Sequence, residues 1–269
     1  MKQTRKGGYN VQQSNVYVIA FSAILTVILG GLLAFSAIGL KPMQDMQVAL
    51  DTQKNILGAV MELKETDDVP AIYEQRIESL VVDAQGEKVS EVDGVPVVAE
   101  DIDVGKQFKL PPEERLYPVF KYQEGSSNQT DAYILPVYGN GLWDNIWGYL
   151  ALENDLKTVK GAVFAHKGET PGLGARITSV DVQERFKGKK IYDEVGELVA
   201  VRMVKGETGD PSIYGDNEVD GLSGATITAV GVNNMLENYL NYYEPYLEKI
   251  TGNTVSQNNS ESKRLTFNN

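Results

Sequence analysis

The chain has 269 residues, 42% of them hydrophobic, so it is long and apolar enough to bury a substantial core. Its formal net charge of −12 argues against nucleic-acid binding, which needs a basic footprint. The absence of cysteine excludes disulfides, thiolate-bound metals and cysteine nucleophiles, and a single histidine argues against a Ser-His-Asp triad and excludes sites built from several histidines. We therefore predict no resident metal and no catalytic side chain.

The first predicted element is a membrane helix. Residues 16–40 read VYVIAFSAILTVILGGLLAFSAIGL, without a charge. At ~1.5 Å per residue such a helix spans roughly 37 Å, enough to cross a hydrocarbon core of about 30 Å. A cleaved signal peptide is the alternative, but its apolar region is shorter, about 7–15 residues, and ends at a small-residue cleavage site. No clean site follows here, so a retained single-pass anchor in the lipid bilayer is expected.

The charges that flank this segment predict its orientation. Lys2, Arg5 and Lys6 precede it, and only Lys41 follows closely. Positively charged flanks tend to stay in the cytoplasm. Residues 1–15 are therefore expected in the cytoplasm, and residues 41–269 on the far side, which is the periplasm if the membrane is a Gram-negative inner membrane.

A membrane-proximal region, 41–115, comes next. Residues 46–64 have apolar side chains at helical spacing, and a second short amphipathic helix is predicted over 71–83. Residues 83–116 are rich in Val, Gly, Pro and Asp, which favours short strands or irregular loops.

The main domain is predicted over 116–250. A turn is expected at 125–130, and a helix at 175–191. Four runs are typical of strands: 131–139, 146–154, 159–169 and 197–206. A last helix begins near Thr228, with Pro245 expected to kink or split it, and the polar tail 251–269 is expected to be disordered. Helices mixed with hairpin-like strands indicate an α+β fold.

Two glycine-rich clusters are candidate binding loops. In PVYGNGLWDNIWG, residues 136–148, a tryptophan flanked by glycines can lie against a planar ligand or can simply be buried at a turn. In HKGETPGLGARI, residues 166–177, Gly172 and Gly174 allow close approach of a ligand to the backbone. A third glycine in register is missing, so this is not a dinucleotide fingerprint. A lone histidine, His166, is more often structural than catalytic.

The third cluster is DGLSGAT, residues 220–226, directly ahead of the last predicted helix. Small residues leave room for a ligand, and the amides and dipole of a helix start suit a phosphate. Alternatively, Ser223 or Thr226 is an ordinary N-cap. Thr228 offers a second hydroxyl two residues further on, so spacing leaves the choice of threonine open.

DGLSGAT resembles the acceptor motif for covalent FMN, and HKGETPGLG and YGNGLW resemble the other two signatures of the FMN-binding domain family. With a basic N-terminus and one membrane helix ending in LKPMQ, the pattern is similar to the C subunits of sodium-pumping NADH:quinone oxidoreductases. The resemblance implies FMN esterified through its phosphate to Thr226. It also implies a set of cofactor-binding residues: Ser223, Gly224, Ala225, Asp220, Gly141, Leu142, Trp143, His166, Glu169, Thr170, Gly172, Leu173 and Gly174.

The same resemblance implies the protein's partners. Other membrane subunits would pass electrons from an iron centre through this FMN to a second covalent FMN, with NADH and quinone met only through the complex. A separate flavin transferase using FAD and magnesium would install the cofactor. The alternatives are the G component of the Rnf ferredoxin:NAD oxidoreductase complex, an anchored module that holds a flavin or phosphate ligand reversibly, and a structural protein of an assembly that has no cofactor.

Overall fold

The computed structural model describes residues 15–125 and 129–266, and part of the turn expected at 125–130 lies outside them. The chain divides into two compact units, 1–50 and 51–269. Helix α1 is the segment Asn15–Gly58. Its residues 15–50 are the described part of the first unit, and its last turns, from residue 51 on, belong to the second unit. There Ile56 and Leu57 are fully buried.

Helix α1 contains the predicted anchor. Within residues 15–125 and 129–266 it is the one helix long and apolar enough to cross a membrane. Two helices, 16–40 and 46–64, were expected, but α1 continues through Pro42 and ends at Gly58. Proline removes one backbone hydrogen bond and favours a kink, and the helix-forming residues on both sides, such as Leu40 and Met43, continue the helix past it.

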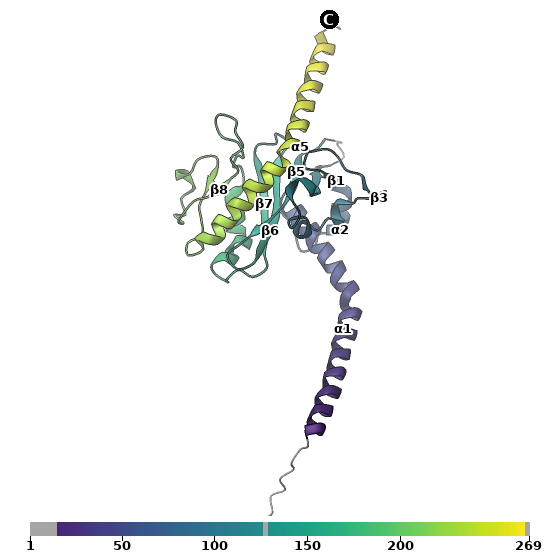
Figure 1. Ribbon diagram of the computed structural model, residues 1–269. Coiled ribbons are helices and arrows are strands. Elements are labelled where there is room, and N and C mark those ends of the chain that lie inside the picture. Colours follow the sequence, from purple (N-terminus) through teal and green to yellow (C-terminus); the bar gives the residue numbers. More distant parts are fainter. Residues whose placement is uncertain (1–14, 126–128, 267–269) are drawn as a thin grey trace, which may run out of the picture. The chain divides into compact units, whose positions relative to one another are not determined.

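The second unit is built on a five-stranded antiparallel sheet of order β1-β4-β5-β6-β7 (Figure 1). The strands are β1 (Ile77–Val82), β4 (Tyr117–Tyr122), β5 (Ala132–Asn140), β6 (Asn145–Glu153) and β7 (Val159–His166). The last three correspond to predicted runs, and the α+β class is confirmed. The β5–β6 pairing runs from Ala132↔Glu153 to Asn140↔Asn145, which leaves a tight turn at 141–144.

The helix expected over 71–83 is only partly present. Helix α2 (Val69–Arg76) is preceded by its N-cap residue Asp68, whose carboxylate accepts a hydrogen bond from the Ala71 amide. It ends where β1 begins, because IESLVV pairs with β4 along its whole length. Pairing and burial in a sheet outweigh a weak helical preference.

Short elements fill the connections. Before β4 they are β2 (Glu91–Val92), β3 (Val95–Pro96), η1 (Ala99–Asp101), α3 (Val104–Gln107) and η2 (Pro112–Glu114), which agrees with the predicted irregular region. The single helix expected at 175–191 is wrong: η3 (Gly174–Thr178), α4 (Val180–Gln183) and η4 (Glu184–Phe186) are separate turns. Ser179, with φ −79° and ψ 144°, is extended and interrupts the helical path.

The run 197–206 forms only a two-residue strand. β8 (Arg202–Met203) pairs in parallel with β9 (Glu218–Val219), outside the main sheet, and η5 (Pro211–Ile213) lies between them in sequence. The positive φ of 55° at Ala200, just before β8, breaks the extended path on that side.

Helix α5 (Thr226–Thr266) lies across the sheet (Figure 1). It buries one face, with Val232, Leu236, Tyr239 and Tyr243 at helical spacing and each no more than 1% exposed. Pro245 lies inside the helix without ending it, and the helix continues to Thr266, past residue 250 where disorder was expected. Extending an existing helix needs no new nucleation, so polar residues can follow in the same conformation.

Candidate cofactor site

The first two glycine-rich clusters and the start of α5, directly after the third cluster, meet at the carboxylate of Glu169. Its Oε1 accepts a hydrogen bond from the Trp143 amide at 3.0 Å, in the β5–β6 turn. Its Oε2 accepts one from the Thr228 hydroxyl at 2.6 Å, in the first turns of α5. One side chain from the second cluster thus joins the first cluster to the helix start that follows the third cluster, although these segments are far apart in sequence.

Burial makes these hydrogen bonds important. Glu169 is 4% exposed and Thr228 is 1% exposed. Burial alone would raise the pKa of the Glu169 carboxyl, but hydrogen bonds from Thr228 and from the amides of residues 142–144 outweigh it, so the pKa lies below its usual value. The carboxylate stays ionised at neutral pH and its donors stay paired.

Glycines allow the segments to approach this closely. A Cβ on Gly174 would collide with Glu169 and with Thr228, and a Cβ on Gly231 would collide with the carbonyl of Asn140. Gly141 faces Glu169 in the same way. These contacts hold the start of α5 against both loops.

The same loops carry exposed apolar side chains. Leu142 and Trp143 are 44% and 69% exposed, and Leu173 is 42% exposed. Leu173 lies beside Gly224 of the third cluster, since a Cβ there would be 3.0 Å from Leu173 Cδ2. On α5, Ile227 and Val230 add further exposed apolar surface. Apolar side chains gathered at convergent loops are typical of a binding surface.

The two candidate threonines are distinguished by exposure. Thr226 is the first residue of α5 and is exposed, whereas Thr228 is buried and its hydroxyl donates to Glu169. Gly224, at φ 77°, turns the chain into the helix in a conformation that glycine adopts at little cost. Of the two threonines, Thr226 is therefore the one that is accessible from solvent.

A cavity of about 340 Å³ opens beside Thr226. Its lining includes Arg202, Lys205 and Asn233. Asn233 is fixed by hydrogen bonds with the amide and the carbonyl of Met203, so β8 is tied to α5. The lining also includes one acidic residue, Glu218, so two cationic side chains against one carboxylate leave the wall with a small positive charge, although the chain as a whole is acidic.

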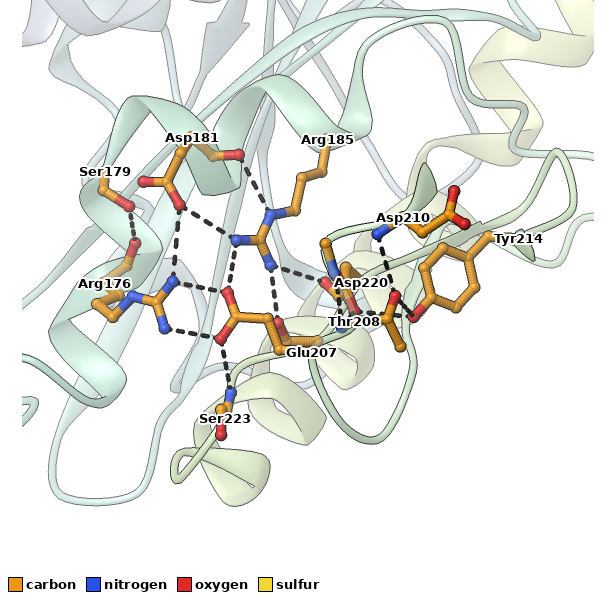
Figure 2. Close-up of polar contacts among 12 residues, drawn as sticks. Arg176, Ser179, Asp181, Arg185, Glu207, Thr208, Asp210, Tyr214, Asp220 and Ser223 are labelled. Carbon is orange, nitrogen blue, oxygen red and sulfur yellow. Dashed lines mark hydrogen bonds and ion pairs between the residues drawn. The ribbon is translucent and has the colours of Figure 1, made fainter. Parts of the chain in front are cut away.

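The carboxylate of Asp220 is hydrogen-bonded to groups within the protein. It accepts hydrogen bonds from the amides of Thr208 and Gly209 and from the Tyr214 hydroxyl, and Asp220 is 7% exposed (Figure 2). Burial would raise its pKa, but these donors lower it on balance. Its contacts hold the 208–214 loop, and its oxygens do not face outward as a recognition group.

The remaining predicted residues have structural surroundings. His166 accepts a hydrogen bond from the Glu169 amide through Nδ1 at 3.2 Å and so supports the turn. The Thr170 carbonyl accepts bonds from the amides of Leu173 and Ala175. Gly172 takes a positive φ of 76° in the same turn. Ser223 and Ala225 lie in the acceptor segment, exposed and buried respectively. Within residues 15–125 and 129–266, no group of three potential ligands can hold a metal ion.

Sequence reasoning missed an ion-pair network next to the third cluster. Glu207 Oε1 lies 2.6 Å from Arg176 Nη2 and 2.7 Å from Arg185 Nη2 (Figure 2). The hydrogen bonds from Arg176 hold the pKa of Glu207 down to about 2. Arg176 lies at the end of the second cluster, but Glu207 and Arg185 belong to no motif, and their spacing in sequence contains no signal that could have found them.

Comparison with known proteins connects this geometry to a family. The family model of the FMN-binding domain matches residues 141–241, which include the second and third clusters and residues 141–148 of the first. A Haemophilus ducreyi protein, named as the C subunit of the Na(+)-translocating NADH-quinone reductase, is 37% identical over 237 residues, 84% of this chain and 90% of that one. A Pseudomonas aeruginosa protein of the same name is 33% identical over 243 residues, 85% of this chain and 92% of that one.

Two solved structures agree. A crystal structure of the C subunit of the same reductase from Parabacteroides distasonis matches with a TM-score of 0.65 and 37% identity, covering 77% of this chain and 96% of that one. The Shewanella oneidensis NqrC structure matches with a TM-score of 0.64 and 27% identity, covering 76% of this chain and 98% of that one.

Proposed function

Because this chain belongs to the family of C subunits of the Na(+)-translocating NADH-quinone reductase, we propose that it is an electron-relay protein of that complex whose FMN is linked covalently to Thr226. The relatives described above all bear the name of this family, so the Rnf alternative is not needed. In this role the other proteins of the complex deliver and accept the electrons, and NADH and quinone react elsewhere in it.

The residues present fit an FMN. Thr226 is exposed at the start of α5, where free amides and the helix dipole favour a phosphate. Arg202 and Lys205 in the adjoining cavity add positive charge near that phosphate. The exposed side chains of Trp143 and Leu173 suit the faces of a flat apolar ring. The exposed hydroxyl of Thr226, together with these surroundings, is the observation that carries the proposal.

The proposed attachment of FMN to Thr226 is a phosphoryl transfer from FAD, in which one P–O bond forms and one breaks. The Thr226 Oγ attacks the phosphorus of FAD that bears the riboflavin part. The Oγ–P bond forms, the P–O bond to AMP breaks, and AMP leaves with the bridging oxygen. The hydroxyl proton passes to a base, which the transferase must supply, because the Asp220 carboxylate in the acceptor motif and the Glu207 carboxylate beside it are both already bonded to donors. No electrons are exchanged in this step.

The chain's own contribution is to position the cofactor. When bound, FMN supplies the electron-transfer chemistry, and the protein sets its position and surroundings. A linkage through the phosphate leaves the ring free, and Glu169 fixes the two loops and the helix start that would surround it. In the alternative function, a module that binds flavin reversibly, the same surface would hold the flavin without a covalent phosphoester bond to Thr226.

The proposal predicts covalent flavin on the full chain. We expect the protein, produced together with a flavin transferase, to give a fluorescent band on a denaturing gel under ultraviolet light. Mass spectrometry should find FMN, less one water, on the peptide that contains Thr226. A dark band with free flavin in the supernatant would instead indicate reversible binding, and no flavin in either fraction would indicate a purely structural protein.

We also propose that the anchor holds residues 41–269 on the periplasmic side of the inner membrane. The support is the excess of Lys and Arg ahead of the apolar helix. Protease added to intact spheroplasts is expected to digest the large domain, and a cytoplasmic marker protein, as control, should survive. If the domain resists protease until the cells are lysed, the proposed orientation is wrong.

A further inference from the structure

We propose that Glu207 and Arg185 are positioning residues for cofactor attachment: they hold the acceptor segment, residues 220–225, in the conformation that presents Thr226. This inference rests on the proposed attachment at Thr226. Both residues lie outside the three glycine-rich clusters, and Figure 2 shows them beside Asp220 and Ser223.

The acceptor segment needs support from outside itself. Residues 220–225 belong to no helix or strand. The segment contains two glycines, Gly221 and Gly224, and glycine has the largest conformational freedom to lose on folding. A short internal bond, from the Ala225 amide to the Leu222 carbonyl at 3.1 Å, closes only the last turn. The conformation before that turn therefore depends on other parts of the chain.

Glu207 holds the middle of the segment. Its Oε2 accepts a hydrogen bond from the Ser223 amide at 3.1 Å, three residues before Thr226. The same carboxylate is fixed by Arg176, which donates at 2.6 Å and 2.8 Å in a two-pronged pair. The Glu207 side chain is 17% exposed, so the pair is largely shielded from water. Charge-assisted, two-pronged pairs of this kind fix geometry well.

Arg185 holds the start of the segment. Its Nη1 donates to the Gly221 carbonyl at 2.8 Å and to the Asp220 carbonyl at 3.3 Å. Its Nη2 donates to Glu207 at 2.7 Å and to Asp181 at 3.1 Å. Arg185 therefore bonds both the acceptor segment and the residue that holds the Ser223 amide.

Together the contacts fix the backbone of the segment without using the Thr226 side chain. An amide and two carbonyls of the segment are bonded to Glu207 and Arg185, and these bonds leave the Thr226 side chain exposed. A transferase that must align the Thr226 oxygen with a phosphorus atom benefits from a preorganised backbone, because disorder there lowers the fraction of productive encounters.

The test measures the rate of flavin attachment. Full-length protein in detergent, isolated without flavin, is incubated with a flavin transferase, FAD and Mg²⁺, and fluorescence of the denatured band is followed with time. Glu207→Gln keeps the shape of the side chain and removes its charge. We expect its attachment rate at saturating acceptor concentration to fall roughly 10- to 100-fold, the factor that corresponds to losing hydrogen bonds to a charged group.

Further variants separate positioning from general stability. Arg185→Lys keeps one donor and should recover part of the rate that Arg185→Met loses. Glu184→Gln is the matched control, since the ion pair of Glu184 is with the exposed Lys187 at 3.7 Å, and it should label at the parental rate. Circular dichroism must show each variant folded at the assay temperature. If Glu207→Gln is not folded, the comparison of the variants Arg185→Lys and Arg185→Met tests the positioning role.

Each outcome bears on a different claim. Folded Glu207→Gln and Arg185→Met proteins that label at the parental rate would overturn the positioning role and leave attachment at Thr226 intact. Equal rates for Arg185→Lys and Arg185→Met at the low value would also count against it. A parent protein that takes up no covalent flavin would refute the proposed function itself.

Discussion

Replacing Thr226 with valine is expected to abolish covalent flavin while the domain still folds. Valine keeps the β-branched shape and lacks the hydroxyl, and the residue is exposed at the first position of α5. Removal of the hydroxyl should cost about 1 kcal/mol at most, the value of an N-cap hydrogen bond. The measurement is ultraviolet fluorescence of the denatured band. In the assembled complex, quinone reduction should fall with it, because one relay station is missing.

Thr228→Val is the matched control and should remain fluorescent. Its hydroxyl donates to Glu169 at 2.6 Å, so this variant is expected to be less stable, by about 1–3 kcal/mol, for leaving a buried carboxylate oxygen without its donor. Thr228→Ser keeps the donor and should restore stability. A fluorescent Thr226→Val protein together with a dark but folded Thr228→Val protein would move the attachment point by two residues.

Glu169→Ala is expected to be the most destabilising substitution at the site. It leaves the Trp143 amide and the buried Thr228 hydroxyl without their acceptor and opens a cavity between the loops and α5. The free energy of unfolding should fall by about 3 kcal/mol or more. In a domain of this size that lowers the melting temperature by roughly 6–12 °C.

The control for this prediction is Glu184→Ala, which removes an exposed carboxylate. The Glu184 and Lys187 side chains are 61% and 63% exposed, so their pair should contribute under about 1 kcal/mol. Calorimetry on the flavin-free protein separates stability from cofactor binding. Melting temperatures that agree within error for Glu169→Ala and the parent would refute the joining role of Glu169.

The parts that could be predicted from sequence are those with local signals. The apolar run, the alternation of β5 to β7 and the small residues before α5 all act over a few residues, and each was placed correctly. The helix at 175–191 was wrong because an extended Ser179 divides an otherwise helical pattern. The strand β1 was missed because its partner, β4, lies about 40 residues further along the chain.

The loops of the candidate site could be predicted from the sequence, but the residues that hold these loops in place could not. The three clusters were found by composition, but nothing local indicates that Glu169 is buried or that it bonds Trp143 and Thr228. The motif resemblance assigns Asp220 to the cofactor site, whereas its carboxylate serves the 208–214 loop. Ion pairs such as Arg185–Glu207 join residues distant in sequence, and only the folded chain brings them together.

The contrast between Thr226 and Thr228 follows from the pitch of α5. Each residue of an α-helix advances about 100°, so side chains two positions apart point about 200° away from each other. When one of the two hydroxyls faces the interior, the other must face solvent. Under the proposed attachment, helix phase would select the threonine: a transferase need not distinguish two identical side chains, since one of them is buried in the core. A one-residue insertion between Ala225 and Ala229 would shift that phase and change which position is offered.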